Sequence, residues 1–273
     1  LKESEALRRT ALEAAEDAHH DGVIYFELRA GPALHARPGL PIEEVIESIL
    51  AGLEEAEAKY GIVTGFIVAG LRNHDPHINT QLAQIACRYM DHGVVGFDLA
   101  GDEARFPAEL HQESFRVVQE SGLPYTVHAG EASGAENVLY AIEALGAIRI
   151  GHGVRSIESR AVMELLRERQ VLLEVCPTSN VHTGTVPTIQ AHPVKALYEY
   201  GIPISINDDD PITSRTRVSN ELMLLHTMFD MPVESLVKIQ LDTLDHCFLR
   251  DKEVVARLKS TVQVFASGLP SIT

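Results

Sequence analysis

The sequence has only three cysteines, an excess of acidic over basic residues, and no long apolar run. Cys87, Cys176 and Cys247 lie far apart without a Cys-x-x-Cys spacing, which argues against a disulfide framework and a thiolate zinc site. With 23 Lys and Arg against 39 Asp and Glu, the formal net charge is −16, which argues against nucleic acid or an anionic membrane as partner. No apolar stretch approaches the roughly 20 residues that span a bilayer. We therefore expect a soluble, cytoplasmic protein that binds a small molecule.

The sequence also lacks the glycine-rich loops of nucleotide-binding α/β folds. Neither Gly-x-Gly-x-x-Gly nor a P-loop follows any predicted strand, so dinucleotide-binding and P-loop folds lose support. No low-complexity linker or solenoid repeat divides the chain. At 273 residues and 45% hydrophobic content, the chain is predicted to form one domain, 1–273.

Short apolar runs alternate with amphipathic segments along most of the chain. The segment 42–57 places apolar residues at steps of three and four, which predicts a helix. After Pro211 the pattern changes to helices at 220–229, 233–248 and 253–265, interpreted as extra C-terminal helices of the same domain. Because the apolar runs do not alternate strictly, they are typical of parallel strands buried on both faces, and the α/β barrel is the favoured fold. The seven predicted strands are 23–29, 62–69, 94–99, 125–128, 148–151, 171–175 and 204–206.

Polar and ionisable residues gather where five of these strands end. Barrels of this kind assemble their sites at the carboxyl ends of the strands, so the shared position is itself a signal. The second run ends in the blander Leu71, Arg72 and Asn73. The five informative ends read Asp98-Leu-Ala-Gly-Asp-Glu103, His128-Ala-Gly-Glu131, Gly151-His-Gly153, Cys176-Pro-Thr-Ser-Asn180 and Asn207-Asp-Asp-Asp-Pro211.

Each of these motifs also has a purely structural interpretation. His128 could be a core histidine, Glu131 a carboxylate at a helix start, and His152 a turn residue between glycines. The acidic run 208–210 could be a solvated turn or a helix N-cap. However, three adjacent carboxylates repel one another, so a cation or substrate donor is needed to offset their charge at a strand end.

An imidazole and a carboxylate point to a metal. His128 and Asp209 offer two of the ligand types that bind Zn²⁺ at open catalytic sites. Catalytic zinc normally takes three protein ligands and a water, so two are insufficient. The pairs His19-His20 and His74-Asp-Pro-His77 are interpreted as a helix end and a loop, and supply none.

The five motifs, in this order, resemble the adenosine deaminase family across nearly the whole chain. The resemblance implies a TIM (β/α)8 barrel of the metal-dependent hydrolase type and the zinc-dependent deamination of adenosine to inosine. It implies that His128 and Asp209 are zinc ligands and that Glu131 gives a proton to purine N1. It further implies that His152 orients and deprotonates the zinc-bound water.

The same resemblance implies that Asp210 and the backbone of Gly101 contact the purine. Two departures from the family pattern follow. The family's first strand carries His-x-His, which this sequence lacks, so we expect that strand and its two zinc ligands to precede Leu1. Asp208 stands where the family usually has Thr or Ser, which leaves the substrate open.

Two alternative functions therefore stay open. The first is deamination of free adenine or another 6-aminopurine derivative. The second, of a different class, is a non-catalytic barrel that has lost its metal site. The zinc deaminases with His-x-Glu and Pro-Cys-x-x-Cys are excluded, because Cys176-Pro177 runs in the opposite order.

Overall fold

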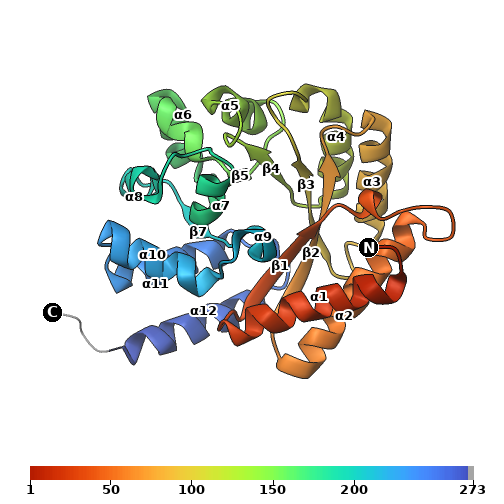
Figure 1. Ribbon diagram of the computed structural model, residues 1–273, viewed down its shortest axis with the longest axis horizontal. Coiled ribbons are helices and arrows are strands. Elements are labelled where there is room, and N and C mark those ends of the chain that lie inside the picture. Colours follow the sequence, from red (N-terminus) through yellow and green to blue (C-terminus); the bar gives the residue numbers. More distant parts are fainter. Residues whose placement is uncertain (270–273) are drawn as a thin grey trace.

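A computed structural model describes residues 1–269, which contain the seven predicted strands flanked by helices (Figure 1). Helices and strands alternate as far as β7, so the prediction of serial βα winding is confirmed. The strands are β1 (Tyr25–Ala30), β2 (Val63–Leu71), β3 (Val94–Ala100), β4 (Thr126–Ala129), β5 (Arg149–His152), β6 (Leu172–Val175) and β7 (Ile204–Ile206).

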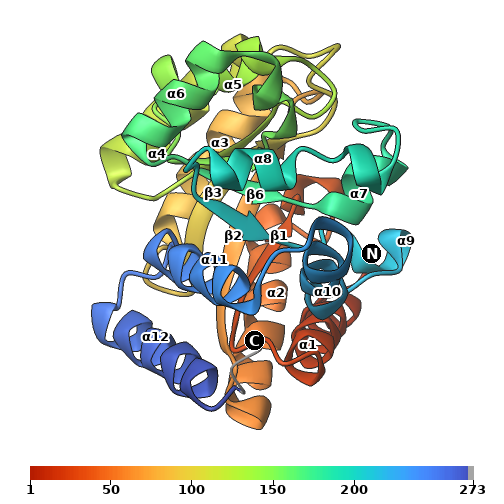
Figure 2. The ribbon, with the colours of Figure 1, turned by 90° about the vertical axis from the view of Figure 1, so that its left-hand side faces the viewer.

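The helices lie around the strands, and the last four described, α9 to α12, follow β7 (Figure 2). Within residues 1–269, none is both long and apolar enough to cross a membrane. The α-helices are α1 (Ser4–His20), α2 (Ile42–Tyr60), α3 (Pro76–Arg88), α4 (Gln112–Ser121), α5 (Ala135–Glu143), α6 (Arg160–Arg169), α7 (Pro177–His182), α8 (Val194–Glu199), α9 (Pro211–Ser214), α10 (Val218–Phe229), α11 (Val233–Asp245) and α12 (Lys252–Ser267). The short 3₁₀ helices are η1 (Pro32–Leu34), η2 (Ala108–His111), η3 (Val154–Glu158) and η4 (Ile189–Ala191).

The strands form two parallel sheets, in the orders β1-β2-β3 and β4-β5-β6-β7. A bridge between Phe97 and Tyr125 joins them, and the Phe97 N–H donates to the Pro124 carbonyl at 3.0 Å. Within residues 1–269, β1 and β7 are each paired on one side only. The fold is α/β and of the TIM-barrel type, as predicted. Because every pairing is parallel, the carboxyl ends of neighbouring strands lie at the same edge of each sheet.

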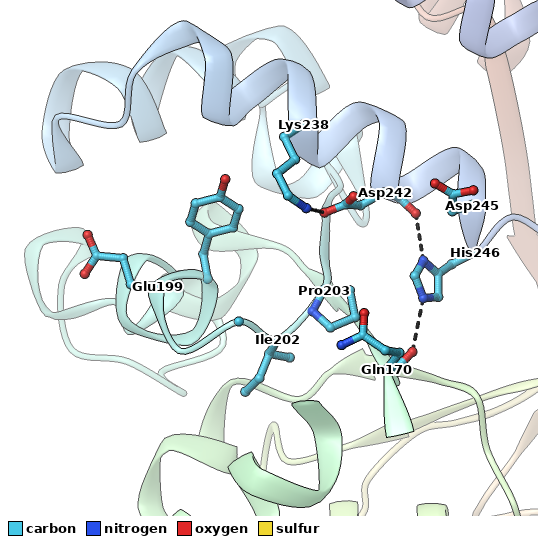
Figure 3. A pocket seen from close by; sticks show the side chains of 10 residues that line it. Gln170, Glu199, Ile202, Pro203, Lys238, Asp242, Asp245 and His246 are labelled. Atoms are coloured by element: carbon cyan, nitrogen blue, oxygen red, sulfur yellow. Dashed lines mark hydrogen bonds and ion pairs between the residues drawn. The ribbon is translucent and has the colours of Figure 1, made fainter. Parts of the chain in front are cut away.

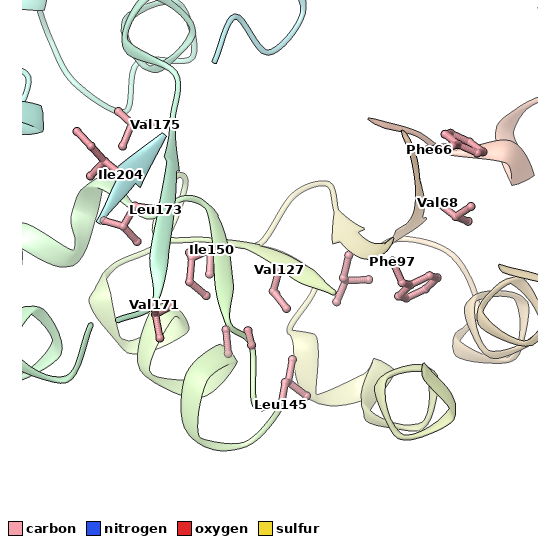
Figure 4. Close-up of a cluster of buried hydrophobic side chains, with 14 of the residues drawn as sticks. Phe66, Val68, Phe97, Val127, Leu145, Ile150, Val171, Leu173, Val175 and Ile204 are labelled. Carbon is pink, nitrogen blue, oxygen red and sulfur yellow. The ribbon is translucent and has the colours of Figure 1, made fainter. Parts of the chain in front are cut away.

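A row of buried apolar side chains runs across the second sheet (Figure 4). Val127 pairs with Ile150, Ile150 with Leu173 and Leu173 with Ile204, one residue from each of the four strands. All four side chains are almost fully buried. Since successive residues of a strand point to opposite faces, the residues beside this row are directed to the other face of the sheet. They include charged side chains.

Five charged side chains, two from the second sheet and three from the first, form an ion chain that joins the two sheets and is called the buried ion chain below. On one side Arg149 of β5 lies 2.7 Å from Glu27 of β1 and 2.6 Å from Glu174 of β6. On the other side Arg29 of β1 lies 2.5 Å from Glu174 and 3.5 Å from Asp98 of β3. Each carboxylate therefore meets a guanidinium, and the buried ion chain links β1 to β3, β5 and β6.

Helix α11 ends earlier than the sequence predicts, and a residue that follows it contacts the buried ion chain. The predicted helix ran to residue 248, whereas α11 ends at Asp245. Outside the helix, the Phe248 N–H is free to donate to Glu27 at 2.9 Å. The Phe248 ring also lies 3.8 Å from the Arg149 guanidinium, in cation–π contact.

We predict that Glu174→Gln lowers the free energy of unfolding at pH 7 by about 3–5 kcal/mol, because it leaves the buried guanidinium of Arg149 and the partly buried one of Arg29 short of a partner. Burial acts to raise the pKa of Glu174, but Arg29 and Arg149 outweigh it and hold that pKa far below its usual range. Its stabilisation is thus complete above the pKa of an unfolded glutamate, about 4.3, and is lost as the pH falls below it. Urea unfolding of both proteins should show the difference narrowing toward pH 3.

The matched control is Glu168→Gln, an exposed glutamate on α6. It should change the unfolding free energy by less than about 0.5 kcal/mol. A Glu174 variant no less stable than this control would contradict the structural importance of the buried ion chain.

Candidate active site

Four of the six predicted site residues meet at the carboxyl ends of β4, β5 and β7. His128 is the penultimate residue of β4, and its ring centroid lies 5.2 Å from that of His152, the last residue of β5. Glu131 follows β4, and its Oε2 lies 3.5 Å from Nε2 of His152. Donor atoms of His152 and Asp209 lie within 4.8 Å of each other. Residues distant in the sequence therefore form one cluster of two imidazoles and two carboxylates.

His128 ends the buried ion chain. Its Nδ1 lies 2.8 Å from Oδ2 of Asp98 and 3.4 Å from the Arg29 guanidinium. Burial acts to raise the pKa of Asp98, but the positive charges of His128 and Arg29 hold it below its usual range. Asp98 and Arg29 both contact Nδ1, which leaves Nε2 of His128 free as a ligand.

The position of His152 depends on the glycines on both sides of it. It is buried and adopts φ 60°, in the left-handed region. A Cβ at Gly151 would lie 3.0 Å from Nδ1 of His128, and one at Gly153 would lie 2.5 Å from Leu173. The Gly-His-Gly motif is thus required for space, since side chains at either position would force the two imidazoles or the core apart.

Hydrogen bonds and burial also define the state of His152. Its Nδ1 lies 3.1 Å from Nδ2 of Asn180, which is fully buried on α7. Burial lowers the pKa of His152, although the nearby carboxylates of Glu131 and Asp209 act to raise it. The imidazole is therefore neutral at physiological pH.

Glu103 fixes the loop that carries Glu131. Its buried carboxylate accepts hydrogen bonds from the backbone N–H groups of Gly130, Glu131 and Ser133, at 3.0, 2.6 and 2.8 Å. A fourth donor is the Asn137 side chain at 3.1 Å. Four donors to one carboxylate fully satisfy a buried charge and hold the loop in one conformation.

The three aspartates after β7 have different surroundings. Asp209 adopts φ 60° and accepts a hydrogen bond from Oγ of Ser179 at 2.6 Å. Asp210 is the N-cap of α9 and accepts hydrogen bonds from the backbone and hydroxyl of Thr213, so the N-cap interpretation applies to this residue. Burial, with neighbouring acidic groups, raises the pKa of Asp208 to about 6. Only Asp209 turns its carboxylate into the cluster with His152.

Gly101 lies beyond the end of β3 and adopts φ +100°. Few other residues adopt this conformation, so the turn requires glycine. The neighbouring Arg72, from the end of β2, is buried, and its guanidinium donates to the carbonyl of His128 at 2.7 Å. The bland end of this strand thus also supports the site.

The cluster offers a chemically suitable place for a divalent metal. The Asp98 carboxylate behind His128 is fully buried, and neither oxygen has an aligned hydrogen-bond donor within residues 1–269. Donor atoms of His152, Cys176 and Asp209 lie within 4.8 Å of one another. The Cys176 thiol is buried and donates to the carbonyl of Glu174 at 3.5 Å, and burial raises its pKa well above its usual range. Nε2 of His128 and the carboxylate of Asp209 are the better metal donors.

A cavity of about 600 Å³ opens at the opposite end of the strands (Figure 3). It is bordered by Gln170, just before β6, and Pro203, just before β7. Lys238 pairs with Asp242 at 2.5 Å, and the two ring nitrogens of His246 lie 2.7 and 3.1 Å from backbone carbonyls. With its lining groups already paired, this cavity lacks the convergent donors of the candidate active site.

Several residues of the site were missed in the sequence analysis. Asp98 and Glu103 lie within a motif that was noticed, but no role was inferred for either. Arg72 and His192 gave no signal, because a lone arginine or a His-Pro pair has no distinctive spacing. Cys176, taken as a remote thiol, instead lies beside the cluster.

Comparison with known proteins identifies this fold and site. The family model for adenosine deaminase matches residues 1–264. An adenosine deaminase from Clostridium botulinum is 38% identical over 264 residues, which cover 96% of this chain and 79% of that protein. The chain is therefore a hydrolase with a TIM-barrel-type fold. It belongs to the adenosine deaminase family and is a deaminase.

Solved structures agree in fold. The crystal structure of an adenine deaminase from Arthrobacter aurescens has a TM-score of 0.91 at 24% identity and covers 98% of this chain and 81% of that chain. An amidohydrolase from Burkholderia ambifaria with bound Zn has a TM-score of 0.91 at 25% identity, over 98% of this chain and 74% of that chain. The family model and the adenosine deaminase relative support an enzyme over the alternative of a non-catalytic barrel that has lost its metal site.

We predict that Glu103→Gln lowers kcat about 10²-fold, because an amide nitrogen would face the backbone N–H groups and displace the loop of Glu131. The backbone amides of Gly130, Glu131 and Ser133 should exchange with deuterium faster than in the wild type. Exchange followed by mass spectrometry, beside steady-state kinetics, measures both effects.

The control is Glu109→Gln, an exposed glutamate a few residues further along the chain. It should leave the exchange of the 130–133 loop and kcat within twofold of the wild type, by the usual tolerance of exposed sites. Unchanged exchange in Glu103→Gln would show that other contacts hold the loop.

Proposed function

We propose that this enzyme is a zinc-dependent deaminase that hydrolyses adenosine, and deoxyadenosine, to the corresponding inosine. The observation that supports this best is the meeting of His128, Glu131, His152 and Asp209 at the strand ends of a family member. The imidazole of His128 and the carboxylate of Asp209 suit a metal, and the carboxylate of Glu131 suits proton transfer.

His128 and Asp209 are the proposed zinc ligands. Both have free donor atoms in the cluster, and Asp98 supports His128 from behind. The proposal includes two further histidine ligands, from a His-x-His segment that residues 1–273 do not contain. When bound, zinc lowers the pKa of a coordinated water from about 15.7 toward about 7 and so supplies the nucleophile.

The remaining residues bind the purine and move protons. Glu131 gives a proton to N1, which withdraws electron density from C6 and requires the carboxyl to be protonated while Asp209 and Asp210 are ionised. His152 orients the water and either accepts its proton or stabilises its charge. Asp210 and the backbone of Gly101 contact the purine.

The proposed hydrolysis consumes only the purine substrate and water, and it needs no oxidant or reductant. The oxygen of water forms a bond to C6, the bond from C6 to the exocyclic nitrogen breaks, and that nitrogen leaves as ammonia with the proton it gains. The product is the 6-oxopurine. Glu131 and His152, whose side chains are 3.5 Å apart, are the groups proposed to lie beside the reacting atoms.

A second candidate is the deamination of free adenine or another 6-aminopurine derivative. Asp208, which stands where the family usually has Thr or Ser, supports keeping it, because this half-buried carboxyl with its raised pKa changes the polarity beside Asp209. Assays of adenosine, adenine and AMP with the full encoded protein decide between these substrates by kcat/KM.

We predict that Glu131→Gln lowers kcat by more than about 10²-fold and leaves zinc content near the wild-type value, because it removes a proton donor but no ligand. Kinetics beside elemental analysis of the same sample measure this. Glu136→Gln, at an exposed glutamate of α5, is the control and should retain activity. Retention of more than roughly a tenth of kcat by Glu131→Gln would rule out the proton-donor role.

We predict that His128→Ala and Asp209→Ala each lower zinc occupancy, whereas Asp210→Ala retains zinc and mainly lowers kcat/KM. The first two remove proposed ligands, and the third removes a purine contact and the N-cap of α9. Elemental analysis after dialysis against a weak chelator measures occupancy. Equal zinc loss from Asp209→Ala and Asp210→Ala would mean that the two aspartates have been assigned wrongly.

A further inference from the structure

A buried relay of hydrogen bonds leads from a backbone amide to His152. It starts at the N–H of Val194, which lies 3.1 Å from Nδ1 of His192. Nε2 of His192 lies 3.2 Å from Oδ1 of Asn180, and Nδ2 of Asn180 lies 3.1 Å from Nδ1 of His152. The three side chains of this relay are each at most 4% exposed, so no solvent competes for these positions.

The direction of the relay follows from its first member. A backbone N–H can only donate, so Nδ1 of His192 must accept and carries no proton. Since an imidazole keeps at least one proton, Nε2 of His192 carries it and donates to its partner on Asn180. That partner must therefore be the carbonyl oxygen, which fixes the orientation of the Asn180 amide.

The orientation of the Asn180 amide in turn determines which nitrogen of His152 carries a proton. With its oxygen toward His192, Asn180 presents its NH₂ group to Nδ1 of His152, which must then accept. The remaining proton of His152 lies on Nε2, the nitrogen 3.5 Å from the Glu131 carboxylate. An N–H donor that faces a carboxylate is favourable, so the contacts of both ring nitrogens indicate the same tautomer of His152.

We propose that Asn180 and His192 are positioning residues that hold His152 as the Nε2–H tautomer. His152 then presents a hydrogen-bond donor to the cluster and has no lone pair there to accept a proton. Of the two roles left open above, the relay selects stabilisation of the charge on the attacking oxygen. This consequence rests on the proposed function, whereas the tautomer itself does not.

Burial is consistent with the relay. It lowers the pKa of His192 to about 4, so the ring is neutral at pH 7 and can accept from Val194. Asn180 is itself held by its main chain, whose N–H donates to Cys176 at 2.9 Å and whose carbonyl accepts from Val186 at 3.0 Å. Neither the His192 ring nor the Asn180 amide can change its orientation without the loss of buried hydrogen bonds.

The test is the tautomer of His152 in the full encoded protein, labelled with ¹⁵N-histidine and loaded with zinc. Long-range ¹H–¹⁵N correlation spectra distinguish a protonated from an unprotonated ring nitrogen, and His152→Gln identifies the signals by their loss. The expected result is a protonated Nε2 and an unprotonated Nδ1. A protonated Nδ1 in the wild type overturns the proposal.

Three variants of the relay are expected to differ in the tautomer of His152. Asn180→Asp offers only acceptors, so His152 should gain a proton on Nδ1, and kcat should fall about 10²-fold with KM changed less than about threefold, the usual effect of a lost charge-stabilising donor. His192→Gln keeps a donor near Nε2 and should retain the wild-type tautomer. His192→Phe, which removes the donor, should give a mixture of tautomers.

The chain supplies a matched control in a second buried Asn–His pair. Nδ2 of Asn79 lies 3.1 Å from Nδ1 of His111, whose Nε2 lies 3.0 Å from a backbone carbonyl. Asn79→Asp should cost comparable stability and leave the His152 signals unchanged. If Asn79→Asp alters kcat and the His152 spectrum as strongly as Asn180→Asp does, the relay is only structural and the proposal fails.

The spectra and the kinetics separate this proposal from the proposed function. A wild type that deaminates none of adenosine, adenine and AMP, yet has the expected tautomer, contradicts the function and supports the relay. An active wild type in which Nδ1 of His152 carries the proton contradicts the relay and supports the proposed function.

Discussion

The buried ion chain is the interaction on which the rest of the structure depends. Ionised groups inside a protein are costly to desolvate, and only close pairing offsets that cost. Glu27 and Arg29 on β1 can be paired only if Arg149 and Glu174 on β5 and β6 lie opposite them. The chain therefore holds two separate sheets in one relative position, and it ends at the histidine that opens the active site.

Three further polar contacts assemble the site from loops that are distant in the sequence. Glu103, after β3, holds the loop after β4. Arg72, after β2, holds the carbonyl of His128. Asn180, on α7, holds the ring of His152. Each contact spans 28 to 56 residues, so the geometry of the proposed site is a property of the folded strands together and not of any one motif.

The fold and the residues of the proposed site could be predicted from the sequence, but the residues that hold them in place could not. Buried parallel strands are nearly continuous apolar runs, and all seven were found within a residue or two at most boundaries. His128, His152 and Asp209 were found because they follow such runs directly. Glu103 and His192 have no local pattern, since their partners lie in other loops and only folding brings them together. The end of α11 was missed for a similar reason, because Phe248 leaves the helix to meet Glu27 and Arg149.

The composition of the buried ion chain has a consequence for electroneutrality. It contains three carboxylates and two guanidiniums, so it carries one net negative charge whenever the neighbouring His128 is neutral, as an imidazole must be to bind a metal. Asp98, the carboxylate that lacks an aligned donor, is the member next to His128. A cation held on the far side of that imidazole enters an interior that already carries its counter-charge. Its affinity is then set partly by Glu27 at the other end of the chain, a residue it never touches.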